Sequence, residues 1–183
     1  MKILKTLLFL LFSVFLVFRS WELFFFLIKE GGLSFLEIFI WTFLLNLFVT
    51  GVFAFPSFVL PLYKLLPKGY YEVRHPKRVT LFYNLLGVSV FKFLLLFFFW
   101  GRGKNRSEFF DGSKSGLTAL VVRSKQAESG HLLPAIILCV LSLVLIINGL
   151  FLHAVLSMSI NFIGNVYPVV LQRKLRIRTQ KLQ

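Results

Sequence analysis

Long apolar runs alternate with short basic segments along the chain, and the lengths of the runs predict membrane-spanning helices. A helix needs about 20 mainly apolar residues to cross the roughly 30 Å hydrocarbon core of a bilayer. We predict spans at about residues 3–28, 33–60, 132–148 and 150–172. The expected fold is an all-α, polytopic membrane protein that forms one integral membrane domain over residues 1–183.

The last two predicted spans belong to one stretch, residues 132–172, that has no formally charged side chain if its histidine is neutral. This stretch is too long for one helix across a roughly 30 Å core and about right for two. Asn148-Gly149 near its middle is a typical turn pair. We therefore predict a C-terminal helical hairpin that returns to its starting side at Arg173.

A further apolar run, residues 79–100, decides the number of crossings. The segment before it and the predicted polar loop after it, residues 101–130, are both basic, as are the two ends of the chain. Positively charged loops stay in the cytoplasm, so we predict four crossings, with both termini cytoplasmic. The 79–100 run would then be a re-entrant or in-plane segment, which Gly87 and Lys92 within it permit. Five crossings, with the loop and the C-terminal tail outside, is the alternative.

Composition agrees with a multi-pass protein of the cell membrane and excludes a soluble domain. The chain is 57% hydrophobic and has a mean hydropathy of +0.82, whereas a soluble domain of this size leaves roughly a third of its surface in water. The formal net charge is +14, but the cations lie between apolar runs, as in cytoplasmic loops that meet anionic headgroups. The expected partners are the membrane and its lipids, not nucleic acid; protein partners stay unspecified.

Cys139 is the single cysteine, and no Cys/His spacing indicates a metal site.

The stretch KQAESGH, residues 125–131, is the first candidate for chemistry. Glu128 and His131 are three residues apart and share one face of a helix. A carboxylate beside an imidazole holds its tautomer and raises its basicity, as a general base requires. This pair would lie at the membrane interface, where a water-soluble donor and a lipid acceptor meet. The structural alternative is an interfacial helix cap.

Polar side chains also recur along the last predicted span at nearly helical spacing. Such a stripe must face protein or a wet cavity, because polar groups are costly in lipid. Hydrogen bonding between helices and a substrate-lined groove both fit this pattern. The stripe consists of His153, Ser157, Asn161, Asn165, Pro168 and Gln172.

A basic run directly follows this stripe and includes Arg173, Lys174, Arg176 and Arg178. One interpretation is a headgroup anchor that ends the span. The other is a patch that binds the phosphates of an acyl carrier such as coenzyme A.

These elements, in this order, resemble the membrane acyltransferases of staphyloxanthin synthesis, the CrtO-like glycosyl-4,4'-diaponeurosporenoate acyltransferase family, mainly over residues 123–178. The family pattern is Lys/Arg-Ala-Glu-x-x-His, then Asn-x-x-x-Asn-x-x-Pro and Gln-Arg-Tyr-Asn-Arg-x-Arg. The chain departs from it at Gln126, Lys174 and Leu175, which leaves the acceptor open. The matching residues are Ala127, Glu128, His131, Asn161, Asn165, Pro168, Gln172, Arg173, Arg176 and Arg178.

The resemblance implies transfer of a fatty acyl group from an activated donor to a sugar hydroxyl of a glycosylated carotenoid or another membrane glycolipid. His131 would be the general base, with Glu128 orienting it. Asn161 and Asn165 would polarise the acyl carbonyl or hold the sugar. The phosphates of the donor would be bound by Gln172, Arg173, Arg176 and Arg178.

No bound cofactor or metal is expected, and acyl-CoA or acyl carrier protein would serve as co-substrate. Two other functions fit the same pattern. One is a non-catalytic polytopic membrane subunit, whose polar stripe binds a partner helix or a lipid. The other is a different membrane transferase, such as an isoprenylcysteine-methyltransferase-like enzyme.

Overall fold

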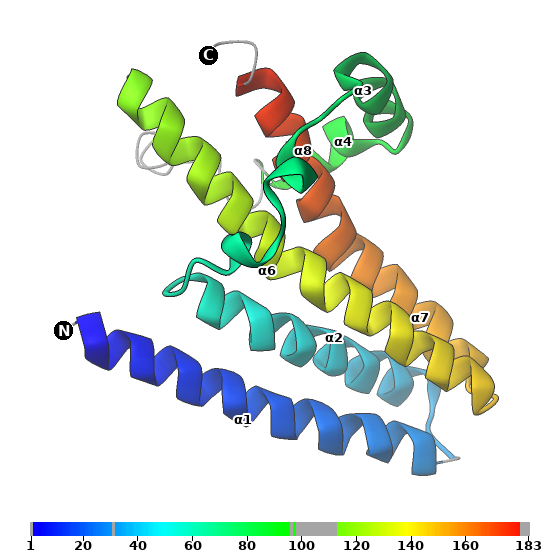
Figure 1. Ribbon diagram of the computed structural model, residues 1–183. Helices are drawn as coiled ribbons and strands as arrows, with labels where there is room; N and C mark the ends of the chain where they lie inside the picture. Colours follow the sequence, from blue (N-terminus) through cyan, green and yellow to red (C-terminus); the bar gives the residue numbers. More distant parts are fainter. Residues whose placement is uncertain (1, 31, 96, 98–112, 180–183) are drawn as a thin grey trace.

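The computed structural model describes residues 2–30, 32–95, 97 and 113–179, and within these residues its regular structure is entirely helical (Figure 1). This confirms the predicted all-α class. The elements are α1 Lys2–Lys29, α2 Phe35–Ser57, the short 3-10 helices η1 Leu62–Leu65 and η2 Lys68–Tyr71, α3 Pro76–Leu85, α4 Val88–Leu95, α6 Lys114–Ile147, α7 Phe151–Asn161, a π-helical turn Phe162–Val166, and α8 Tyr167–Thr179.

Four helical segments of the described chain are long and apolar enough to cross a membrane: Ile3–Lys29, Phe35–Ser57, Gly116–Ile147 and Phe151–Thr179. The last of these is a continuous rod made of α7, the π-helical turn and α8. Gly149 has a φ of +76° between α6 and α7, a left-handed conformation that glycine adopts readily. It therefore forms the turn of the predicted C-terminal hairpin.

The start of α6 differs from the prediction. This helix begins at Lys114, so the predicted polar loop 101–130 is wrong from residue 114 onward, and residues 101–112 lie outside the described residues. The Ser113 hydroxyl caps the helix by accepting a 2.9 Å hydrogen bond from the Gly116 N–H. No proline occurs between this cap and Pro134. The 34 residues of α6 give a length of about 51 Å, so its first part extends beyond a roughly 30 Å hydrocarbon core.

The end of α2 and the first half of α6 lie at the same end of the bundle. The side chain of Gln126 on α6 donates a hydrogen bond to the carbonyl of Ser57, the last residue of α2. This bond holds the end of α2 against α6. The α1–α2 connection and the α6–α7 turn lie at the opposite end, whereas α1 begins and α8 ends at the end of the bundle where α2 finishes (Figure 1). The chain between α2 and α6 therefore starts and finishes on one side, which favours four crossings over five.

The predicted segment 79–100 is bent where the structure describes it. The axes of α3 and α4 differ by 70°, and Gly87 between them has a φ of +70°. Both helices lie beside α8 (Figure 1). The Tyr167 hydroxyl donates a 2.7 Å hydrogen bond to the Leu86 carbonyl, and Lys174 Nζ donates one of 2.8 Å to Asn84. A bent pair held along α8 agrees with the in-plane or re-entrant interpretation.

A reporter fused after Ser113 tests this topology. We expect the reporter to lie on the same side of the membrane as one fused to the N-terminus, because α2 and α6 meet at one end of the bundle. Enzymatic reporters that are active on only one side of the membrane measure this. Activity on the side opposite to the N-terminus would contradict four crossings and would move Glu128 and His131 to the other face.

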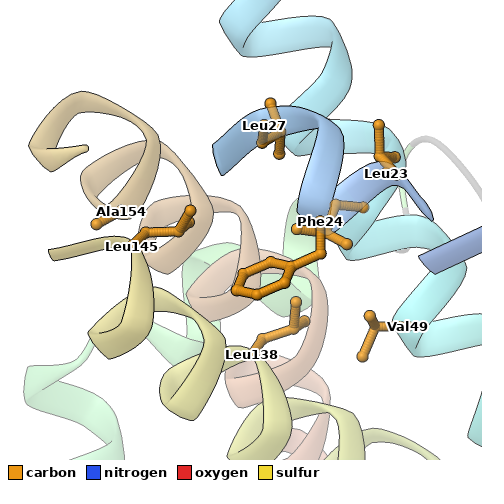
Figure 2. Packing of buried hydrophobic residues seen from close by; sticks show 8 residues of the cluster. Leu23, Phe24, Leu27, Val49, Leu138, Leu145 and Ala154 are labelled. Carbon is orange, nitrogen blue, oxygen red and sulfur yellow. The ribbon is translucent and has the colours of Figure 1, made fainter. Parts of the chain in front are cut away.

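The apolar centre of the bundle lies where α1, α2, α6 and α7 meet. In Figure 2 the Phe24 ring points from α1 toward Leu138 and Leu145 of α6. Most other large apolar side chains of α1 are exposed, including Trp21, as expected for a lipid-facing helix. Helices in a bilayer associate through close packing and buried polar contacts, and these helices carry buried polar side chains such as Asn46, Ser142 and Ser157.

Candidate functional site

The two sequence elements predicted to carry chemistry meet at the end of the bundle where α2 finishes. Glu128 and His131 come from α6, and the asparagines and arginines come from the α7–α8 rod. The pairing of these residues differs from the prediction, and two separate clusters result.

The Glu128 carboxylate is the centre of the first cluster, called here the carboxylate cluster. The side chain is fully buried. Its Oε1 accepts a 2.8 Å hydrogen bond from Arg173 Nε and one of 2.7 Å from the Tyr70 hydroxyl. Its Oε2 forms an ion pair with Arg176. The carboxylate thus faces α8 and η2, and the predicted contact in which Glu128 orients His131 is not formed. The physical reason is that a buried carboxylate is stabilised most strongly by paired cations.

Two tyrosines of η2 complete this cluster and were missed from the sequence. The guanidinium of Arg173 lies over the Tyr70 ring at 4.4 Å, and that of Arg176 lies over the Tyr71 ring at 5.2 Å. Burial, reinforced by the charge of Glu128, raises the pKa of Tyr70 well above its usual range and the pKa of Tyr71 to about 12. Both hydroxyls therefore stay protonated near neutral pH. The adjacent tyrosines in the short segment between Pro67 and Pro76 were the available signal.

His131 belongs to the second cluster. Its Nδ1 lies 3.1 Å from Asn165 Oδ1. The Asn165 amide is oriented by its Nδ2, which donates hydrogen bonds of 3.1 Å to Asn161 Oδ1 and 3.0 Å to the Thr50 hydroxyl. Because an amide oxygen only accepts, the neutral ring carries its proton on Nδ1 and its lone pair on Nε2. Asn165 therefore orients the imidazole in the way predicted for Glu128.

The polar stripe faces protein, as predicted. His153, Ser157, Asn161 and Asn165 are all buried. Ser157 accepts a 3.2 Å hydrogen bond from Asn46 of α2, and Asn161 donates one of 3.0 Å to the Ala135 carbonyl of α6. These bonds join three helices, so this part of the stripe holds the bundle together.

Asn161 and Asn165 are four residues apart, a spacing that places two side chains on the same face of a helix. The π-helical turn Phe162–Val166 begins directly after Asn161 and contains Asn165. Pro168 follows this turn and lacks an N–H group. The Asn165 amide meets His131 and Thr50 of α2, and the Asn161 amide meets the Ala135 carbonyl of α6.

The predicted phosphate-binding residues do not form one patch. Arg176 is almost fully buried, and Arg178 is exposed. The Gln172 carbonyl accepts a 3.2 Å hydrogen bond from Ser124 of α6. Arg173 and Arg176 both pair with Glu128, which neutralises part of their charge. Their contact with a substrate stays a prediction.

A pocket of about 600 Å³ opens beside the carboxylate cluster. We call it the basic pocket, because Lys64 of η1, Lys68 of η2 and Lys125 of α6 line it together with Arg176. Lys125 Nζ lies 5.1 Å from the centre of the Tyr71 ring. The three lysines carried no predicted role. Lys64 and Lys68 are four residues apart, and Lys125 lies far from both in the sequence. Their only common signal is positive charge near the membrane interface.

Comparison with known proteins gave one result. The model of a family described as CrtO: Glycosyl-4,4'-diaponeurosporenoate acyltransferase matches residues 67–183. The matched part contains η2 and all following elements, and hence both the carboxylate cluster and the His131–Asn165 pair. Comparisons with curated proteins and with solved structures gave no match.

Proposed function

Because the chain belongs to the CrtO family of glycosyl-4,4'-diaponeurosporenoate acyltransferases, we propose that it transfers a fatty acyl group from a thioester donor to a sugar hydroxyl of a glycosylated carotenoid or a related membrane glycolipid. The observation that carries this proposal is the His131–Asn165 pair, which holds an imidazole in the tautomer of a general base. This pair lies close to the end of the bundle that gathers the cations, where a lipid acceptor and a soluble donor would meet.

The reaction follows from this arrangement. His131 Nε2 takes the proton of the sugar hydroxyl as the hydroxyl oxygen attacks the thioester carbonyl carbon. The new C–O bond forms, the C–S bond breaks, and the imidazolium returns the proton to the leaving thiolate. One ester and one free thiol result. Asn165 is the positioning residue for the ring, and Asn161 holds the amide of Asn165 in place.

The depth of the site suits this chemistry. From Glu128 to Ile147 the nineteen steps of α6 correspond to about 28 Å, close to the thickness of the hydrocarbon core. Glu128 would then mark one boundary, with His131 about one turn inside it. Cations concentrate at this end of the bundle, as in Lys5, Lys64 and Lys125, so we place it and both termini on the cytoplasmic face of the cell membrane.

Membranes that contain the chain, incubated with labelled donors, test the proposal. One reaction receives an acyl thioester labelled in the acyl group, and a parallel reaction receives a labelled methyl donor. We expect label in an ester of the glycosylated carotenoid from the acyl donor alone. Membranes without the chain are the control. Methyl incorporation that depends on the chain, or no incorporation from either donor, would contradict acyl transfer.

A further inference from the structure

Three lysines of the basic pocket form a site whose charge is not used inside the protein. Lys64 and Lys68 are exposed, and neither forms an ion pair with a described carboxylate. The Lys125 ammonium lies over the face of the Tyr71 ring and forms no ion pair with a described carboxylate. Among the described residues, Glu72 is the single carboxylate that lines the pocket, and Glu128 compensates part of the charge of Arg176. The lysines therefore give the pocket a net positive charge.

We infer that the basic pocket binds the phosphate groups of a nucleotide-type acyl thioester donor, with Lys64, Lys68 and Lys125 as the anion-binding residues. This inference rests on the proposed function, because it supplies the donor side of the same reaction. It also changes the predicted phosphate ligands from the arginines of α8 to lysines on three other elements.

The size and walls of the pocket favour this ligand class. Ligand pockets commonly measure about 300–1,000 Å³, and the basic pocket, at about 600 Å³, has room for a nucleotide. The rings of Tyr63 and Tyr71 line it and offer apolar faces for a base. Three ammonium groups around one hollow complement several phosphate charges. A phospholipid headgroup also carries a phosphate, but it has no nucleobase that could pack against Tyr63 and Tyr71.

The position of the pocket also fits a donor with a flexible arm. Lys125 and His131 are six residues apart on α6, which corresponds to a rise of about 9 Å. A thioester joined to its phosphates by an extended linker spans this distance and places its carbonyl near His131. The phosphates would then stay outside the hydrocarbon core, while the acyl chain enters it.

A charge-matched pair of triple variants of the purified full chain tests this inference. The pocket variant carries Lys64→Gln, Lys68→Gln and Lys125→Gln, and the control variant carries Lys29→Gln, Lys77→Gln and Lys92→Gln. Both lose the same net charge, but the control residues do not line the pocket. We measure the Kd of coenzyme A by equilibrium binding and the KM of an acyl-CoA donor.

The pocket variant is expected to raise both constants at least tenfold and to change kcat less than twofold, whereas the control variant changes each less than twofold. The wild-type Kd should rise with salt, because screening weakens the phosphate contacts. An unchanged Kd and KM in the pocket variant would overturn the inference, even with acyl transfer intact. Coenzyme A binding that depends on the lysines, without acyl transfer from any donor, would support the pocket and contradict the proposed function.

A second measurement separates the two sources of phosphate. Wild-type protein and the pocket variant are mixed with vesicles of neutral phosphatidylcholine, with or without anionic phosphatidylglycerol, and coenzyme A binding is measured again. Equal coenzyme A affinities in both vesicle types support the donor site. If anionic lipid abolishes coenzyme A binding and binds the wild type but not the pocket variant, the pocket is a headgroup site and the inference fails.

Discussion

Replacing His131 with glutamine is expected to lower acyl transfer by about 10²–10⁴-fold, the range that a general base contributes. Glutamine retains an N–H group that can donate to Asn165 Oδ1, so the neighbouring amide keeps its partner. The substitution removes the basic nitrogen and leaves the fold in place. Ester formation by the purified protein, normalised to its folded fraction in detergent, measures the effect.

His75 provides the matched control for this substitution. It is exposed before α3 and makes no side-chain capping hydrogen bond, so His75→Gln is expected to keep wild-type activity. Full activity in the His131→Gln variant would show that the imidazole is not the base. The two clusters would then both be structural, and the family reaction would need another proton acceptor.

Replacing Glu128 with alanine is expected to destabilise the protein by about 3–5 kcal/mol, the usual effect of breaking a buried ion pair from one side. The substitution leaves the guanidinium of Arg176 buried without its carboxylate and removes the acceptor of Arg173 and Tyr70. Unfolding in detergent, followed by helical circular dichroism against denaturant, measures the change in the free energy of unfolding.

The exposed pair of Arg19 and Glu22 on α1 serves as the control. Its side chains are 52% and 61% exposed, so Glu22→Ala should change the free energy of unfolding by less than about 1 kcal/mol. A Glu128→Leu, Arg173→Met, Arg176→Met variant should recover part of the stability, because it removes the buried charges together. Equal stabilities of the Glu128→Ala and Glu22→Ala variants would contradict the carboxylate cluster.

The helices were predictable because the thickness of the bilayer fixes the length of an apolar run. The start of α6 could not be predicted in this way, because tertiary contacts bury the polar side chains in its first half. Ser124 and Glu128 would be exposed on an isolated helix, but α8 and η2 cover them. Local polarity therefore indicated a loop where the chain forms a helix.

The residues of the candidate site could be predicted from the sequence, but which side chains contact one another could not. Helical spacing placed Glu128 and His131 on one face, yet the orientation of α8 decides which partner each side chain meets. The arginines bind the carboxylate, and Asn165 of the π-helical turn meets the imidazole instead. Thr50 is one polar residue in an apolar run, and it gains a role only because α2 lies against the π-helical turn that carries Asn165.

The central claim is that this chain moves an acyl group from a thioester to a lipid-linked sugar. The most direct measurement uses the purified chain in lipid nanodiscs with acyl-CoA and a glycosylated carotenoid, and quantifies the ester and the free thiol together. We predict equal amounts of both products, formed only when chain, donor and acceptor are all present. Thiol release without ester, or neither product from folded protein, would contradict the claim.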